Sequence, residues 1–173
     1  MSDKSSESFS YDWSRFTQRI DVKSTPGQAY AHWATRKGIE KWFLRDAIFT
    51  SAEGKPRDPA DAIQKGDKYE WTWHGYDDSM LERGEVTDAN GKDRFQFTFG
   101  KAGNVTVTIT EEMGTLIVSL LQEKIPTDEY SKVYFHVGCT KGWVFYLANL
   151  KSILEGGLDL RNKNVALQEM LNA

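Results

Sequence analysis

Residues 128–157 read DEYSKVYFHVGCTKGWVFYLANLKSILEGG, a stretch without proline that ends at a pair of glycines. Apolar side chains recur in it every three or four residues, which at 100° per residue places them on one face of a helix. This stripe consists of Phe135, Cys139, Trp143, Tyr146, Leu150 and Ile153. Asp128 is a suitable N-terminal cap, and Gly156-Gly157 is a suitable end. The spacing therefore predicts one long helix from Asp128 to Glu155, with one face buried.

A second apolar arc lies on the same predicted helix, beside the stripe. It consists of Val133, Tyr134, Val137, Val144, Phe145 and Ala148. A helix at a protein surface needs only one apolar face, so the arc requires a further contact. The candidates are the aliphatic C-terminal segment 158–171, a ligand or a second copy of the chain. Large exposed apolar patches are rare on monomers, and we therefore favour a homodimer.

The chain before this helix alternates between apolar and polar residues in six or seven short segments. Such alternation is typical of half-buried strands. The segments lie near residues 15–22, 47–50, 69–74, 81–87, 95–99, 105–110 and 116–120. Asn90-Gly91 and Met113-Gly114 are turn sequences between neighbouring segments, so we expect an antiparallel sheet.

Two short helices are expected between the first two strands. Ser24-Thr25-Pro26 is typical of a helix start, Gly38 is expected to break that helix, and Ile39–Leu44 is expected to form the second. The order is then strand, two short helices, six strands and a long helix. This order predicts an α+β fold in which a twisted antiparallel sheet curves around the C-terminal helix.

Composition limits the function classes. The chain has 173 residues and a formal net charge of −3, which suits one domain and disfavours a general nucleic-acid grip. One cysteine can form neither an internal disulfide nor a cysteine-based zinc site. No apolar run approaches the ~20 residues of a membrane span, and the polar N-terminus does not resemble a signal peptide. We therefore expect a cytoplasmic protein with a disordered head at 1–12, one domain at 13–157 and a tail at 158–173 that packs on the domain or at a dimer interface.

Several short motifs along the chain resemble those of one superfamily. They are Ile20-Asp21-Val22, Thr25-Pro26, Ala29–Thr35, Ile39-Glu40-Lys41-Trp42-Phe43, Gly66–Trp71, Gly142-Trp143 and Leu154–Arg161. Their order over residues 13–161 is similar to that of START-like (SRPBCC) proteins, and within these to homologues of the activator of heat-shock protein ATPase. The resemblance implies a helix-grip fold with a cavity between the concave sheet and the long helix, where relatives hold apolar or amphipathic small molecules. It also implies a chaperone as an alternative partner, although we find no counterpart of the N-terminal domain that the eukaryotic namesake carries.

Aromatic residues make up 13% of the chain and include six tryptophans. Such rings either fill an ordinary core or form the apolar wall of a ligand pocket. Stacking on nucleic-acid bases is disfavoured, because no basic stripe accompanies the rings. The residues expected to line the cavity are Trp42, Trp71, Trp73, Phe97, Cys139, Trp143 and Tyr146.

Three polar residues, Glu70, His74 and His136, are candidates for orienting a ligand in that cavity. Glu70 and His74 share one face of the strand at 69–74, and the sequence leaves open whether this face or the tryptophan face points inward. His136 lies close to the Trp143 stripe, either in the pocket or as a hydrogen-bonded core residue. A histidine beside a carboxylate in a cavity would suit proton transfer, which keeps a small-molecule enzyme as an alternative.

No catalytic residue, metal site or cofactor site is predicted. Cys139 follows His136 by three residues, but a thiol in an apolar stripe is normally inert. The histidines are too far apart in sequence for a helical metal motif. Ligand binding therefore ranks ahead of catalysis and of a chaperone-activator-like interaction domain. The turn-rich segment 51–67 is expected to be a movable lid over the cavity.

Overall fold

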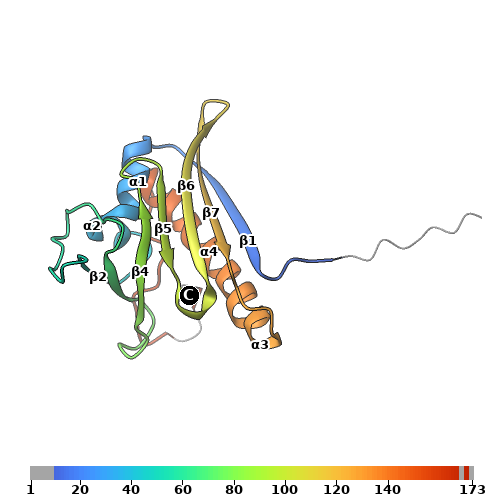
Figure 1. Ribbon diagram of the computed structural model, residues 1–173. Helices are drawn as coiled ribbons and strands as arrows, with labels where there is room; N and C mark the ends of the chain where they lie inside the picture. The colour runs from blue at the N-terminus through green and yellow to red at the C-terminus, as the bar shows by residue number, and fades with distance from the viewer. Residues whose placement is uncertain (1–9, 168–169, 172–173) are drawn as a thin grey trace, which may run out of the picture.

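The computed structural model describes residues 10–167 and 170–171 and confirms the predicted α+β, helix-grip architecture (Figure 1). Seven antiparallel strands form one sheet in the order β1-β7-β6-β5-β4-β3-β2. The strands are β1 (Arg15–Val22), β2 (Asp46–Thr50), β3 (Lys68–Thr72), β4 (Glu82–Ala89), β5 (Arg94–Thr98), β6 (Asn104–Glu112) and β7 (Thr115–Glu123). The helices are α1 (Pro26–Ala34), α2 (Arg36–Ile39), η1 (Gly100–Ala102), α3 (Glu129–Ser131), η2 (Lys132–Val137) and α4 (Gly138–Leu154).

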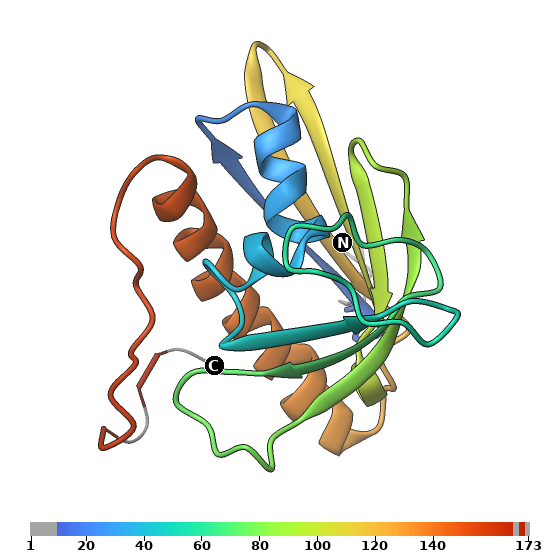
Figure 2. The ribbon, with the colours of Figure 1, turned by 90° about the vertical axis from the view of Figure 1, so that its left-hand side faces the viewer.

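The last three helices follow one another without a break and cross the concave side of the sheet (Figure 2). The segment begins where predicted, because an Asp128 carboxylate oxygen accepts a hydrogen bond from the Ser131 N–H at 3.0 Å. Its middle part, η2, is a π-helix, whose wider turns were not expected from the sequence. In α4 the stripe residues Trp143, Tyr146 and Leu150 are buried against the sheet.

The boundary between α1 and α2 differs from the prediction that Gly38 breaks the first helix. Thr35 ends α1, and its hydroxyl accepts a hydrogen bond from the Gly38 N–H at 2.9 Å. Gly38 lies inside α2, where a Cβ would come within 2.0 Å of the carbonyl oxygen of Ala31. The glycine therefore permits close packing of α2 on α1 rather than ending a helix, and α2 begins three residues before the predicted start at Ile39.

The C-terminal segment turns back after α4, and hydrogen bonds hold the first residues of this segment against the rest of the domain. Arg161 donates hydrogen bonds of 2.8 Å to the carbonyl oxygens of Leu44 and Lys41, and Asn149 accepts one from the Leu160 N–H at 2.8 Å. Val133 and Val144 of the second apolar arc stay about half exposed, so the described part of the tail does not cover them. Most of the predicted head, residues 1–9, lies outside the described residues.

Candidate functional site

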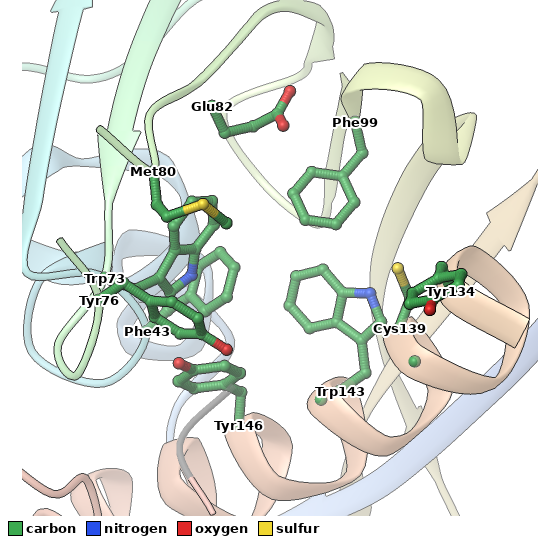
Figure 3. A pocket seen from close by; sticks show the side chains of 12 residues that line it. Phe43, Trp73, Tyr76, Met80, Glu82, Phe99, Tyr134, Cys139, Trp143 and Tyr146 are labelled. Atoms are coloured by element: carbon green, nitrogen blue, oxygen red, sulfur yellow. The ribbon is translucent and has the colours of Figure 1, made fainter. Parts of the chain in front are cut away.

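A pocket of about 320 Å³ opens between α4 and the concave side of the sheet (Figure 3). Three structural parts form its wall: the turn after α2, the connection from β3 to β4 with the start of β4, and the long helix. Phe99, which follows β5, completes the wall. The lining residues are Phe43, Trp73, Tyr76, Met80, Glu82, Phe99, Tyr134, Gly138, Cys139, Gly142, Trp143 and Tyr146.

Trp143 is held in one orientation by a hydrogen bond on the side of its ring that faces the core. Its indole N–H donates a 2.8 Å hydrogen bond to the side-chain oxygen of Gln122 on β7. The amide nitrogen of Gln122 donates in turn to the carbonyl oxygen of Ala102 at 2.9 Å, and Gln122 is fully buried. With its polar edge bonded in the core, Trp143 presents carbon surface to the pocket, at ring-centroid distances of 4.9 Å from Phe43 and 5.9 Å from Phe99.

Four of the sequence-predicted cavity residues line this pocket, namely Trp73, Cys139, Trp143 and Tyr146. Burial raises the pKa of the Cys139 thiol, which favours the neutral, unreactive form. Burial also raises the pKa of Tyr146, whose phenol is neutral near pH 7 even at its ordinary pKa of about 10. These groups supply surface and weak polarity rather than a nucleophile.

Three other predicted rings lie in the core and do not line the pocket. Trp71 stacks on Tyr69 at a centroid distance of 3.7 Å, and Phe97 packs on Trp71 at 5.0 Å. Trp42 is fully buried and donates from its indole N–H to the carbonyl oxygen of His32 at 2.9 Å. Strand alternation correctly places Trp71 and Phe97 on the concave side of the sheet. It does not show which residues of that side lie at the pocket and which lie deeper in the core.

The polar residues predicted to orient a ligand also lie elsewhere. Tyr69 and Trp71 point inward, so Glu70 lies on the outer face of the sheet, where it accepts a 3.1 Å hydrogen bond from Arg83. His74 follows β3 and does not line the pocket. Burial and the nearby cations Arg161 and Lys163 lower the pKa of His74. The sequence left open which face of the strand at 69–74 points inward, and the structure shows that it is the face with the tryptophans.

His136 is buried, but it faces the N-terminal segment. Its Nδ1 lies 2.9 Å from the carbonyl oxygen of Trp13, and its Nε2 lies 2.8 Å from the hydroxyl of Tyr11. A carbonyl only accepts, so Nδ1 carries a proton and, in the neutral ring, Nε2 accepts from Tyr11. The prediction near the Trp143 stripe assumed 100° per residue, and the π-helix over Lys132–Val137 breaks that assumption.

The segment 51–67 packs at α1, α2 and β2 and contributes no lining residue to the pocket. Asp67 accepts two hydrogen bonds of 2.8 Å from Arg57, and the Ile63 N–H donates to the carbonyl oxygen of Ala34 at 2.8 Å. The connection that does border the pocket is the one from β3 to β4, with Trp73, Tyr76 and Met80.

Sequence reasoning did not select Glu82, the charged residue of the wall. The alternation of this strand could have indicated it. Val86 is buried, and residues two and four positions before it, Gly84 and Glu82, lie on the same side of the strand. Tyr134 was placed in the second arc, whereas it is both exposed and at the pocket mouth. Tyr76 and Met80 lie in a connection without periodicity, so no sequence pattern indicated them.

Within residues 10–167 and 170–171, no group of three or more histidine, cysteine, aspartate or glutamate side chains could hold a metal ion. In the same part of the chain, no helix is long and apolar enough to cross a membrane.

The fold is similar to several solved structures. A protein from Staphylococcus saprophyticus superposes with a TM-score of 0.64 at 17% identity, over 85% of this chain and 96% of its own. The Aha1 dimer from Colwellia psychrerythraea gives 0.61 at 16% identity, over 83% and 97%. A Mesorhizobium loti protein gives 0.62 at 14% identity, over 82% and 97%. At these identities the likeness shows the fold alone.

Comparison with curated protein sequences finds no match. The family model described as Activator of Hsp90 ATPase homolog 1-like protein matches residues 23–155, which include every residue that lines the pocket. This match confirms the resemblance inferred from the sequence motifs. Since it extends over more than half of the sequence, the chain belongs to the family of Activator of Hsp90 ATPase homolog 1-like proteins.

Proposed function

We propose that the protein binds a small apolar or amphipathic molecule in the pocket between α4 and the sheet. The observation that carries this proposal is the wall itself, in which seven of the twelve lining residues are aromatic. A volume of about 320 Å³ lies at the small end of the range found for ligand pockets, roughly 300–1,000 Å³. Binding is favoured over catalysis by a histidine–carboxylate pair, because His74 and His136 lie outside the pocket, where Glu82 has no histidine beside it, and the Cys139 thiol is held neutral.

Ligand entry is expected to change tryptophan fluorescence, because Trp73 and Trp143 form part of the wall. We expect 4-phenylbutan-1-ol, a neutral amphipathic probe, to produce a saturable change. Trp143→Phe should reduce the amplitude, whereas Trp13→Phe should not, since Trp13 contacts His136 on another side of the helix. Mass spectrometry of a solvent extract of the purified protein tests separately for a retained ligand.

Gly142→Leu is the blocking variant for this experiment. Gly142 lies between Gly138 and Tyr146 at helical spacings of four residues, and all three line the pocket. A leucine there should extend into the pocket and weaken probe binding at least about tenfold. Ala148→Leu, at an exposed position of the same helix, should leave probe binding unchanged. A saturable signal that persists in Gly142→Leu, or no signal from a broad probe panel, would contradict the proposal.

A second candidate function is assembly through the outer face of the long helix. Val133, Val137 and Val144 are 58%, 42% and 54% exposed, and Tyr130 stacks on Tyr134 beside them. The structural neighbour from Colwellia psychrerythraea is a dimer. We infer that a homodimer uses this face, with a chaperone, the partner that the family description suggests, as the alternative occupant. A cytoplasmic location and the exclusion of nucleic acid stay predictions of the sequence.

Sedimentation velocity at micromolar concentration tests the dimer. We expect a dimer for the natural chain and a monomer for Val133→Lys/Val137→Lys, because two buried ammonium groups from each chain would oppose association. Lys65→Ala, in the segment 51–67 on another part of the domain, should not change the oligomeric state. A natural chain that sediments as a monomer would contradict the dimer and leave the face to another partner.

A further inference from the structure

Glu82 is the charged residue of a wall that is otherwise neutral in the described part of the chain. It begins β4, and the alternation of that strand places Glu82, Gly84 and Val86 on the concave side. The neighbouring Arg83 points outward and pairs with Glu70 at 3.1 Å. Figure 3 shows the Glu82 carboxyl group at one end of the pocket, beyond Met80 and Phe99.

The carboxyl group of Glu82 has no cationic partner among the described residues. None of the ion pairs formed within residues 10–167 and 170–171 includes it. Burial raises the pKa of Glu82, and the backbone N–H of Arg83 offsets only part of this effect. A partly desolvated carboxylate without a counter-charge gains more from an incoming cation than an exposed one does.

The backbone beside this group is shaped to admit it. Gly100 has φ of +48°, and a Cβ at this position would lie 2.7 Å from one carboxylate oxygen of Glu82. A side chain at residue 100 would therefore displace the carboxyl group. The glycine leaves room for Glu82 at the end of the pocket.

The rest of the wall suits a cation as well as an apolar body. The rings of Phe43, Phe99 and Trp143 surround the interior, with centroid distances of 4.9 Å and 5.9 Å from Trp143 to the other two. Aromatic faces carry negative electrostatic potential and attract ammonium groups. An anion would meet both these faces and the Glu82 carboxylate, which oppose it.

We propose that this pocket selects an amphipathic organic cation, an amine whose ammonium group pairs with Glu82 while its apolar part lies between the aromatic rings. This inference rests on the proposed function and adds the charge of the ligand. A metal cation does not fit, because Glu82 is a single carboxylate and the described residues form no metal-binding group around it.

Three probes of one skeleton test the charge preference: 4-phenylbutylamine, 4-phenylbutan-1-ol and 4-phenylbutyrate, measured by isothermal titration calorimetry at pH 7.5. We expect the amine to bind at least about tenfold more tightly than the acid, with the alcohol between them. In Glu82→Gln, which keeps the shape of the side chain, the amine should lose about tenfold while the alcohol changes little.

Glu85→Gln is the matched control, since it removes a carboxylate from the exposed side of the same strand. It should leave the affinity for the amine unchanged, and circular dichroism should show that both variants are folded. If the acid binds as tightly as the amine, or if Glu82→Gln keeps full amine affinity, the cation preference is wrong while ligand binding stands. If none of the three probes binds the natural protein, both proposals fail.

Discussion

Replacing Trp143 with alanine is expected to lower the free energy of unfolding by about 3–5 kcal/mol, the usual cost of truncating a large core ring. Trp143 is 3% exposed and packs on Phe43 and Phe99. Its loss would also leave the buried side-chain oxygen of Gln122 without its indole donor, which adds a desolvation cost. Because Trp143 also borders the pocket, its removal would enlarge an existing space.

Urea unfolding followed by circular dichroism measures this effect. Trp143→Phe, which keeps a ring but loses the bond to Gln122, should cost about 1–2 kcal/mol. Lys65→Ala, at an exposed position in the segment 51–67, should change the free energy by less than about 0.5 kcal/mol. An unchanged urea midpoint for Trp143→Ala would mean that this ring does not stabilise the helix against the sheet.

The fold could be predicted because the repeating patterns in this sequence are local. Alternation in segments such as Phe95–Phe99 needs only neighbouring residues to be recognised, and the sheet confirms it with Phe95 and Phe97 buried. The capping residues Thr25 and Asp128 also act within one helical turn, and both accept the backbone hydrogen bonds expected of them. Gly38 was misinterpreted because its role depends on the distance between two helices, which no local pattern contains.

The site was less predictable because it depends on where the regular patterns stop. Trp71 and Trp73 belong to the same inward series, yet Trp71 is fully buried and Trp73, beyond the end of β3, reaches the pocket. His136 was assigned to the pocket from an ideal helix, and the π-helix places it against Trp13 and Tyr11 instead.

A second group of interactions that should stabilise the fold lies outside the pocket, where the C-terminal segment contacts the chain between α2 and β2. The Arg161 side chain is 2% exposed, and Asp159 accepts hydrogen bonds from its guanidinium group at 2.9 and 2.7 Å. Lys163 lies 2.8 Å from the same carboxylate, and Asn149 donates to it at 3.1 Å. Burial alone would raise the pKa of Asp159, but the hydrogen bonds from Arg161 and Lys163 outweigh it and hold this pKa well below its ordinary value.

Asp159→Asn is expected to lower the free energy of unfolding by about 3 kcal/mol at pH 7, because it leaves the buried guanidinium of Arg161 without a counter-charge. A carboxyl group whose pKa is depressed in the folded state stabilises the fold above its unfolded pKa of about 3.9 and loses this contribution as the pH falls. The difference in the free energy of unfolding between the natural chain and the variant should therefore be constant from pH 7 to pH 5 and shrink below about pH 4.

Urea unfolding at each pH measures this difference. Lys163→Met, at a 55% exposed side chain, is the control and is expected to cost less than about 1 kcal/mol. A difference that grows on acidification, or a variant as stable as the natural chain at pH 7, would show that Asp159 does not neutralise Arg161 in the fold.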